Sequence, residues 1–302
     1  MPARAHRYAR LDEMPTLTHA GQRLAYAEHG TGPRACVLLH GLLLSQRMHL
    51  PLARDLARRG HRVITLDLLG HGASDRPPEM WRYSMTAFAE QVVALLDHLE
   101  LDEAVIAGTS LGANVALEGA ALAPDRVRGM VVEMPVLDNA LVACALAFTP
   151  LMVALTVGEP VMRGVQQLAR AVPERGLPEL ANVVLDTMRQ DPRPSGAVLQ
   201  GLFFGRIAPH RAQRRGFDMP ALVIGHRRDP VHPFSDAGML ADELPDGRLL
   251  EAESLLELRL APARLTGEIA DFLDECWRPR GARPRRAGGR GGASSGRAAE
   301  VG

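Results

Sequence analysis

The sequence predicts an α/β fold in which a mostly parallel central sheet has helices on both faces and carries an inserted helical cap. Three observations lead to this prediction. Short apolar runs alternate with amphipathic stretches of helical period between residues 16 and 134, and the alternation resumes at Pro220. Residues 135–215 interrupt it with helical stretches and no convincing strand. Alternating strands and helices are typical of a parallel sheet that is covered on both faces.

The first part of the core, residues 1–134, is predicted to open with a hairpin and to continue with buried parallel strands. Continuous apolar runs are expected where both faces of a strand are covered. Ser84 fits a helix N-cap because an apolar stripe of helical period follows it. The predicted strands are Thr16–His19, Leu24–Glu28, Ala35–Leu39, Arg62–Asp67, Ala104–Ala107 and Val127–Glu133, and the predicted helices are Met48–Arg59, one after Ser84 and one after Ser110.

The second half of the chain is predicted to hold the cap, the rest of the core and a tail. Residues 135–215 are repeatedly broken by proline and should form a helical cap over the carboxyl edge of the sheet, where ligands bind in such folds. Residues 216–277 return to the core pattern, with strand Ala221–Gly225, helix Ser235–Leu244, strand Arg248–Glu251 and a helix from Pro262. Residues 278–302 are rich in Arg and Gly and are expected to be disordered.

Charge and cysteine content exclude several classes of function. The chain has 35 basic and 35 acidic residues, and no lysine. Because residues 278–302 hold seven Arg and one Glu, a charge of +6, the other 277 residues carry −6. This gives no general case for a nucleic-acid partner. The three cysteines are odd in number and lack metal-ligand spacing, so we expect no disulfide framework, metal or cofactor.

Two segments bear on localisation. Residues 1–10 are polar and basic and do not resemble a secretory signal, which favours a cytoplasmic protein. Leu141–Val157 is almost continuously apolar and approaches the length of a membrane span. Pro150 interrupts this segment and Asp138 precedes it, so we expect a buried or lid helix and no membrane span. The oligomeric state is not predicted.

The chemistry is predicted to centre on Gly108-Thr109-Ser110-Leu111-Gly112, which matches Gly-x-Ser-x-Gly. An apolar strand precedes this motif and a small-residue helix follows it, as in a nucleophile elbow, a sharp turn that exposes the serine hydroxyl. Gly108 and Gly112 suit a turn where strand and helix leave no room for a Cβ atom. Ser110 would then lie at a helix N-terminus, where free N–H groups favour developing negative charge.

With these motifs the sequence resembles the α/β-hydrolase fold family, in its esterase- and haloperoxidase-like branch, over about 260 of its 302 positions. The residues that carry the resemblance are Val37-Leu38-Leu39-His40-Gly41, Asp67 to Asp75, the elbow at Ser110, and Ala221–Gly225 leading to Asp229. The resemblance implies that Ser110 is the nucleophile and Asp229 the acid of a catalytic triad. It also implies an oxyanion hole formed by the backbone N–H groups of Leu42 and Leu111.

The sequence departs from this family where the triad histidine is expected. In the family that histidine follows the last strand, but no histidine occurs after His232, and Leu255 falls at about the family position. Serine is a poor nucleophile without a neighbouring base. His226 and His232 lie three residues on either side of Asp229, and His232 is the better candidate base. The alternative is that both are polar loop residues.

Three functions remain open from the sequence. The leading hypothesis is hydrolysis of an ester or thioester of a small to medium apolar acyl compound, because the predicted cap is apolar at Leu141–Val157 and at Leu202, Phe203 and Phe204. The second is a lyase, cyclase or isomerase that uses the oxyanion hole without an acyl-enzyme. The third is an inactive member that binds a lipophilic ligand. His40 and His71 are expected to shape loops in all three.

Overall fold

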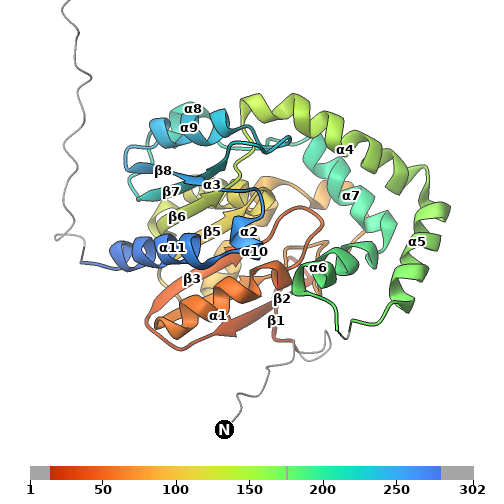
Figure 1. Cartoon of the computed structure of the whole chain (residues 1–302), viewed down its shortest axis with the longest axis horizontal. Helices are drawn as coiled ribbons and strands as arrows, with labels where there is room; N and C mark the ends of the chain where they lie inside the picture. Colours follow the sequence, from red (N-terminus) through yellow and green to blue (C-terminus); the bar gives the residue numbers. More distant parts are fainter. Residues whose placement is uncertain (1–13, 175, 280–302) are drawn as a thin grey trace, which may run out of the picture.

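The computed structural model describes residues 14–174 and 176–279 and has a central sheet with the strand order β1-β2-β4-β3-β5-β6-β7-β8 (Figure 1). Strand β2 pairs antiparallel with β1 and β4, and the strands from β4 to β8 are parallel, as predicted. The strands are β1 (Thr16–His19), β2 (Gln22–His29), β3 (Arg34–Leu39), β4 (His61–Leu66), β5 (Ala104–Thr109), β6 (Val127–Glu133), β7 (Ala221–His226) and β8 (Gly247–Ala252).

Helices cover both faces of this sheet and make two hydrophobic cores. Helices α1 (Leu50–Arg58) and α11 (Ala263–Cys276) pack on one face, around Leu56, Leu265 and Leu273. Helices α2 (Met85–His98), α3 (Leu111–Leu122) and α9 (Phe234–Glu243) pack on the other. The prediction of helices on both faces is therefore confirmed.

Differences from the predicted elements are local. Residues predicted to begin the first helix form the 3₁₀ turn η1 (Gln46–His49), and a short helix α10 (Glu257–Leu260) was not predicted. Ser84 is an N-cap as predicted, because its hydroxyl accepts a hydrogen bond of 3.1 Å from the Ala87 N–H. The remaining 3₁₀ turns are η2 (Met80–Arg82), η3 (Pro124–Arg126) and η4 (Asp138–Ala140).

Between β6 and β7 the described residues form helices and no strand. We call this segment the helical insertion; its helices are α4 (Leu141–Thr156), α5 (Glu159–Ala171), α6 (Glu179–Met188), α7 (Pro192–Phe203) and α8 (Arg211–Arg214). Figure 1 shows α4 to α7 arched together on one side of the sheet, away from α11. Helices α4 and α7 pack against each other, and α6 packs against η1 of the core.

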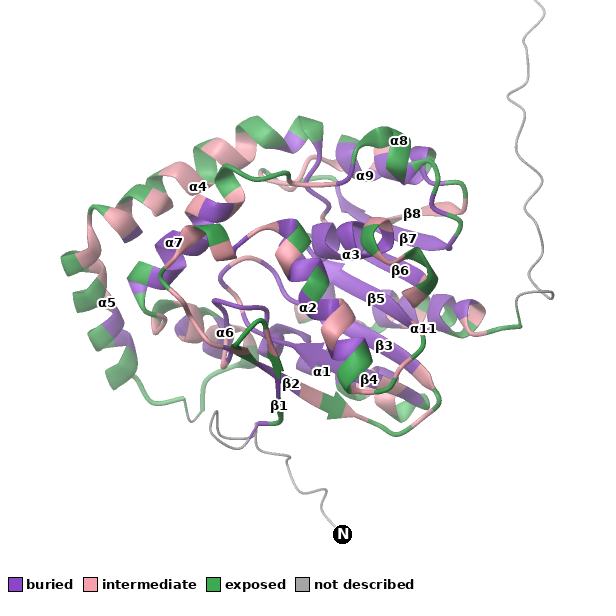
Figure 2. Cartoon of the chain, turned by 180° about the vertical axis from the view of Figure 1, so that it is seen from behind, coloured by how far each residue is buried: buried purple, intermediate pink, exposed green. Residues whose placement is uncertain are grey.

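Helix α4 lies at the surface of the insertion. Figure 2 shows α4 and α5 largely exposed or half-buried, whereas the strands are buried. The segment Asp138–Thr156 is long and apolar enough to cross a membrane by length and composition, and only 11% of it is buried. Leu155 is the one fully buried side chain of α4, while Val142 and Leu146 are more than two-thirds exposed. Burial in the core, one of the two expectations for this helix, is therefore wrong.

The predicted disordered tail, residues 278–302, lies outside the described residues from 280 onwards. Its first residue takes part in the fold. The Arg128 guanidinium donates to the carbonyls of Cys276 and Arg278, at 2.7 and 2.9 Å, and stacks on the Trp277 ring at 4.6 Å.

Candidate active site

Ser110 lies at the sharp turn between β5 and α3, in a backbone conformation with φ 54° and ψ −109°. A non-glycine residue at such a φ costs on the order of 1–3 kcal/mol, which the surroundings must offset. The flanking glycines make the turn sterically possible. A Cβ on Gly108 would lie 2.2 Å from the backbone of Gly112, and a Cβ on Gly112 would lie 2.2 Å from the carbonyl oxygen of Leu39. Strand and helix therefore approach as the motif predicts.

His232 brings a ring nitrogen to the Ser110 hydroxyl. Its Nε2 lies 2.8 Å from Ser110 Oγ, and its Nδ1 lies 2.8 Å from Asp229 Oδ2. These contacts fit a neutral imidazole whose Nδ1–H donates to the carboxylate and whose Nε2 accepts from the hydroxyl. The three side chains come from the elbow and from the loop between β7 and α9. They have the order of contacts expected of a nucleophile, a base and an orienting acid.

Asp229 is held by the backbone of its own loop. Its second oxygen, Oδ1, accepts hydrogen bonds from the N–H groups of Val231 at 2.8 Å and His232 at 2.9 Å. Burial raises the pKa of this carboxyl, but the hydrogen bonds from His232 and Val231 outweigh burial, and the net shift is downward. Asp229 therefore stays ionised at neutral pH and favours the Nδ1–H tautomer of His232.

The N–H groups of Leu42 and Leu111 meet no hydrogen-bond acceptor within the described part of the chain. Leu111 is the first residue of α3, where N–H groups are free by helix geometry. Leu42 lies in a turn closed by a 3.1 Å hydrogen bond from Leu44 N–H to the Gly41 carbonyl. The following residue, Leu43, has φ 57°. Two unpaired donors thus lie near Ser110, because Leu42, Ser110 and Leu111 line one cavity.

His40 and His71 support this region without reaching Ser110. His40 Nδ1 lies 2.8 Å from the Gly41 carbonyl, and its Nε2 accepts from the Leu68 N–H at 3.1 Å. His71 Nδ1 lies 3.0 Å from the Leu69 carbonyl. Burial lowers the pKa of both imidazoles, so both stay neutral. These contacts agree with the expectation that the two histidines shape loops.

An ion-pair cluster joins Arg259, four positions after Leu255, to the ends of β5 and β6. Arg259 Nη2, from α10, donates to Thr109 Oγ1 and to Glu133 Oε2, both at 3.0 Å. Thr109 also donates to Glu133 Oε2 at 2.5 Å. Burial raises the pKa of Glu133, but Arg259, His226 and Thr109 together outweigh burial, and the net shift is downward. Sequence reasoning missed this cluster. The available signal was a charged residue, Glu133, at the end of an apolar strand.

His226, the second candidate base, belongs to the same cluster. Its Nδ1 lies 2.9 Å from the Ser254 carbonyl, and its Nε2 lies 3.6 Å from Glu133 Oε1. Burial lowers the pKa of His226, but Glu133 and the Ser254 carbonyl outweigh burial and raise it. Of the two histidines, the structure brings only His232 within hydrogen-bonding distance of Ser110.

Two cavities meet at Ser110 and share Leu42, Ser110 and Phe148 as lining residues. The first has a volume of about 200 Å³ and its walls are almost entirely apolar. The second, of about 390 Å³, also contains His232, Asp229 and Arg259. In the first, burial raises the pKa of the Cys144 thiol to about 11, so it stays protonated at neutral pH. Among the described residues no group of three or more His, Cys, Asp or Glu could hold a metal ion.

A sequence model of the alpha/beta hydrolase fold matches residues 35–253. Bifunctional epoxide hydrolase 2 of Sus scrofa is 36% identical over 117 residues, which are 38% of this chain and 20% of that protein. The match thus spans about one fifth of that relative. An uncharacterized protein of Mycobacterium tuberculosis is 28% identical over 286 residues, 86% of this chain and 82% of that protein.

Solved structures share the fold. The enol-lactonase of Burkholderia xenovorans LB400 superposes with a TM-score of 0.69 at 23% identity, covering 86% of this chain and all of that one. At this identity the likeness shows the fold alone.

Proposed function

The chain belongs to the α/β-hydrolase family, and on that premise we propose that it hydrolyses an ester or thioester of a small to medium apolar acyl compound through Ser110. The observation that supports this most directly is the continuous contact from Ser110 Oγ to His232 Nε2 and from His232 Nδ1 to Asp229, each 2.8 Å. In this proposal His232 is the base, in place of the histidine that the sequence lacks at the family position.

In the proposed reaction Ser110 Oγ attacks the ester carbonyl while its proton passes to His232 Nε2. The N–H groups of Leu42 and Leu111 stabilise the oxyanion of the tetrahedral intermediate. His232 then gives the proton to the departing alcohol or thiol, which leaves an acyl group on Ser110. Water attacks this acyl group while His232 accepts a proton from the water, and His232 then returns that proton to Ser110 Oγ as the acid leaves. Asp229 orients His232 and stabilises its protonated form.

The serine favours acyl transfer over the epoxide hydrolysis that the Sus scrofa relative is named for. A serine oxygen that opened an epoxide would form an ether, and water does not readily cleave an ether. An acyl group on serine is an ester, which the same base and oxyanion hole can hydrolyse. Ser110 therefore fits a substrate that has a carbonyl group.

The two cavities suggest how such a substrate lies. The leaving group must be near His232, because His232 protonates it, and His232 lines only the cavity of about 390 Å³. We therefore assign the leaving group to that cavity, which we call the leaving-group cavity. The apolar acyl group then occupies the cavity of about 200 Å³, the acyl cavity, which Ala145 and Phe148 of α4 help to line.

A fluorophosphonate probe tests the proposal on the intact chain. Stoichiometric labelling that disappears in Ser110→Ala, together with turnover of p-nitrophenyl esters, is the expected result. No labelling and no turnover would favour the lyase, cyclase or isomerase alternative, or an inactive binding protein. Labelling without turnover would show a reactive serine whose substrate is not a simple ester.

A further inference from the structure

The turn that carries the Leu42 N–H is held by the helical insertion. The carbonyl oxygen of Leu43, the next residue, accepts a hydrogen bond from Thr187 Oγ1 at 3.0 Å and another from Gln190 Nε2 at 2.8 Å. Thr187 lies in the last turn of α6, and Gln190 follows this helix. Thr187 Oγ1 also lies 3.2 Å from the Val183 carbonyl of its own helix, so the hydroxyl is shared between the two.

The side chain of Leu43 also packs against the helical insertion. It is buried in a small cluster with Leu155 of α4 and Leu199 of α7, which is separate from the two cores of the sheet. Backbone and side chain of Leu43 are therefore both held by the helical insertion. Besides its own closing hydrogen bond, the turn contacts the core through His40 Nδ1, which lies 2.8 Å from the Gly41 carbonyl, and through Met48 Sδ, which lies 3.3 Å from the Gly41 nitrogen.

The backbone conformation of Leu43 makes this support necessary. Its φ of 57° lies in the left-handed region that favours glycine. A leucine remains there only where its surroundings hold it, because the extended and right-handed regions are more favourable for a side chain. Rotation of the backbone at Leu43 would turn the Leu42–Leu43 peptide group, and through the Leu42 Cα it would displace the Gly41–Leu42 peptide group that carries the Leu42 N–H.

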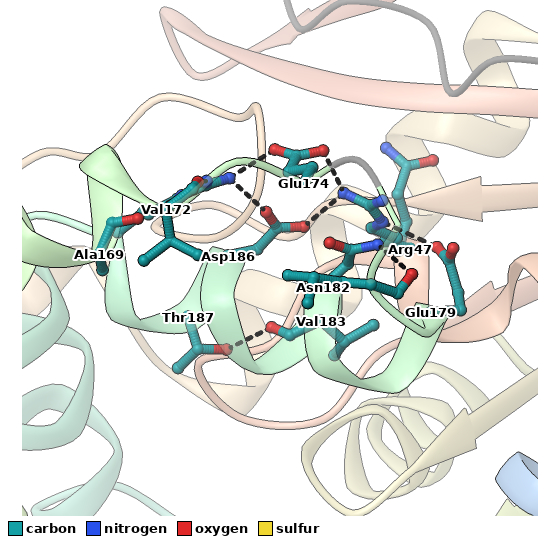
Figure 3. A network of polar contacts seen from close by, with 12 residues as sticks. Arg47, Ala169, Val172, Glu174, Glu179, Asn182, Val183, Asp186 and Thr187 are labelled. Atoms are coloured by element: carbon teal, nitrogen blue, oxygen red, sulfur yellow. Dashed lines mark hydrogen bonds and ion pairs between the residues drawn. The ribbon is translucent and has the colours of Figure 1, made fainter.

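Gln190 and α6 are in turn fixed to the core. The Gln190 side-chain oxygen accepts from Arg76 Nη1 at 3.1 Å, and Arg76 also binds the Gly70 and Gly72 carbonyls at 3.0 and 2.8 Å. Arg47 of the core meets three carboxylates, which lie before α6, at its first residue and in its last turn, as Figure 3 shows. Its distances to Glu179, Glu174 and Asp186 are 2.7, 3.1 and 3.2 Å.

We propose that Thr187 and Gln190 are positioning residues. Through the Leu43 carbonyl they hold the turn of residues 41–44, which carries the Leu42 N–H of the proposed oxyanion hole, so that catalysis depends on α6 being docked on the core. The inference rests on the proposed function, since it concerns the same oxyanion hole. A substrate can enter with the turn displaced, but the transition state needs the Leu42 N–H in place. The two side chains therefore act on kcat and much less on KM.

The test compares the original chain with a double variant that carries both Thr187→Val and Gln190→Met. Both substitutions keep the approximate shape of the side chain and remove its donor to Leu43. Thr187→Ser is the conservative variant, because it keeps the hydroxyl. Thr156→Val is the matched control, since Thr156 donates to the Met152 carbonyl within α4, at 2.7 Å, and lines neither cavity.

We expect the double variant to lose roughly tenfold to a hundredfold in kcat on p-nitrophenyl esters, with KM changed less than about threefold, because loss of a whole oxyanion donor costs about 10²–10³. An alkyl boronic acid, which mimics the tetrahedral intermediate on Ser110, should bind weaker by a similar factor. Thr187→Ser and Thr156→Val should keep the kcat of the original chain.

The outcomes separate the two proposals. If the original chain neither labels nor turns over esters, the proposed function fails. If it is active but the double variant keeps its kcat and its boronic-acid affinity, the positioning role is wrong and the proposed function stands. A change confined to KM, or a kcat loss that Thr156→Val shares, would likewise contradict positioning through Leu43.

Discussion

His232 Nδ1 lies 2.8 Å from the carboxylate of Asp229, and the two residues are three positions apart on one loop. The same carboxylate accepts the backbone N–H of His232 at 2.9 Å. One loop therefore supplies both the proposed base and the group that orients it, whereas in the resembled family the histidine follows the last strand.

The first prediction concerns this pair. His232→Ala should lower kcat on p-nitrophenyl esters by several orders of magnitude, because loss of the base from such a triad removes most of the catalysis. Asp229→Asn should also lower kcat strongly, since the amide no longer favours the productive tautomer. His210→Ala removes an exposed histidine and is the control. Esterase activity that survives in His232→Ala would refute the proposed base.

The second prediction tests the two cavities. Ala145→Phe should fill part of the acyl cavity and shift the preferred p-nitrophenyl ester toward shorter acyl chains. Val183→Phe changes the wall of the leaving-group cavity and should leave the acyl preference unchanged. It should lower kcat/KM for esters in which one short acid is joined to a bulky alcohol. The measurement is kcat/KM over both substrate series. If the two variants exchange these effects, the assignment of the cavities is reversed.

The third prediction concerns pH and the buried pair of His226 and Glu133. Glu133 raises the pKa of His226 against the effect of burial, and its own pKa is lowered. A raised pKa in the folded state gives stability that is fully present below the unfolded value, about 6.5, and is lost as pH rises through the folded value. The Tm difference between the original chain and His226→Gln should therefore be larger at pH 5.5 than at pH 8.5.

His210→Gln, at an exposed histidine, serves as the control. A difference for His226→Gln that grows as the pH rises would show that His226 is buried in its neutral form and would contradict the ion pair.

Features set by residues close together in the sequence could be predicted, whereas contacts between residues far apart in the sequence could not. Strand β6 was predicted to the residue, because a continuous apolar run shows where a doubly covered strand begins and ends. The closeness of His232 to Asp229 was foreseeable from their spacing. The pairing of Glu133 with Arg259 was not, because the two residues are 126 positions apart and only the closed sheet brings them together. The support of Leu43 by Thr187, 144 positions away, is of the same kind.

The fourth prediction concerns the C-terminus. A chain that ends after Pro279 should keep the Tm of the full chain, because the removed residues are polar or small and have little apolar surface to bury. A chain that ends after Trp277 should be slightly less stable, by about 0.5–1.5 kcal/mol, because Arg128 loses its hydrogen bond to the Arg278 carbonyl. A marked loss of Tm on removal of 280–302 would show that this segment docks.

The last prediction decides whether α4 is a surface helix of a folded insertion or a membrane segment. Leu155 is 6% exposed and packs with Leu43 and Leu199, whereas Leu146 is 74% exposed. Leu155→Ala should therefore cost about 2–5 kcal/mol through the cavity it leaves, while Leu146→Ala should leave Tm nearly unchanged. The two variants make the same chemical change in the same helix, so each controls for the other. We expect the chain and Leu146→Ala to remain in the aqueous fraction without detergent. Recovery from membranes only, with retention weakened by Leu146→Ala, would instead identify α4 as a lipid-contacting helix.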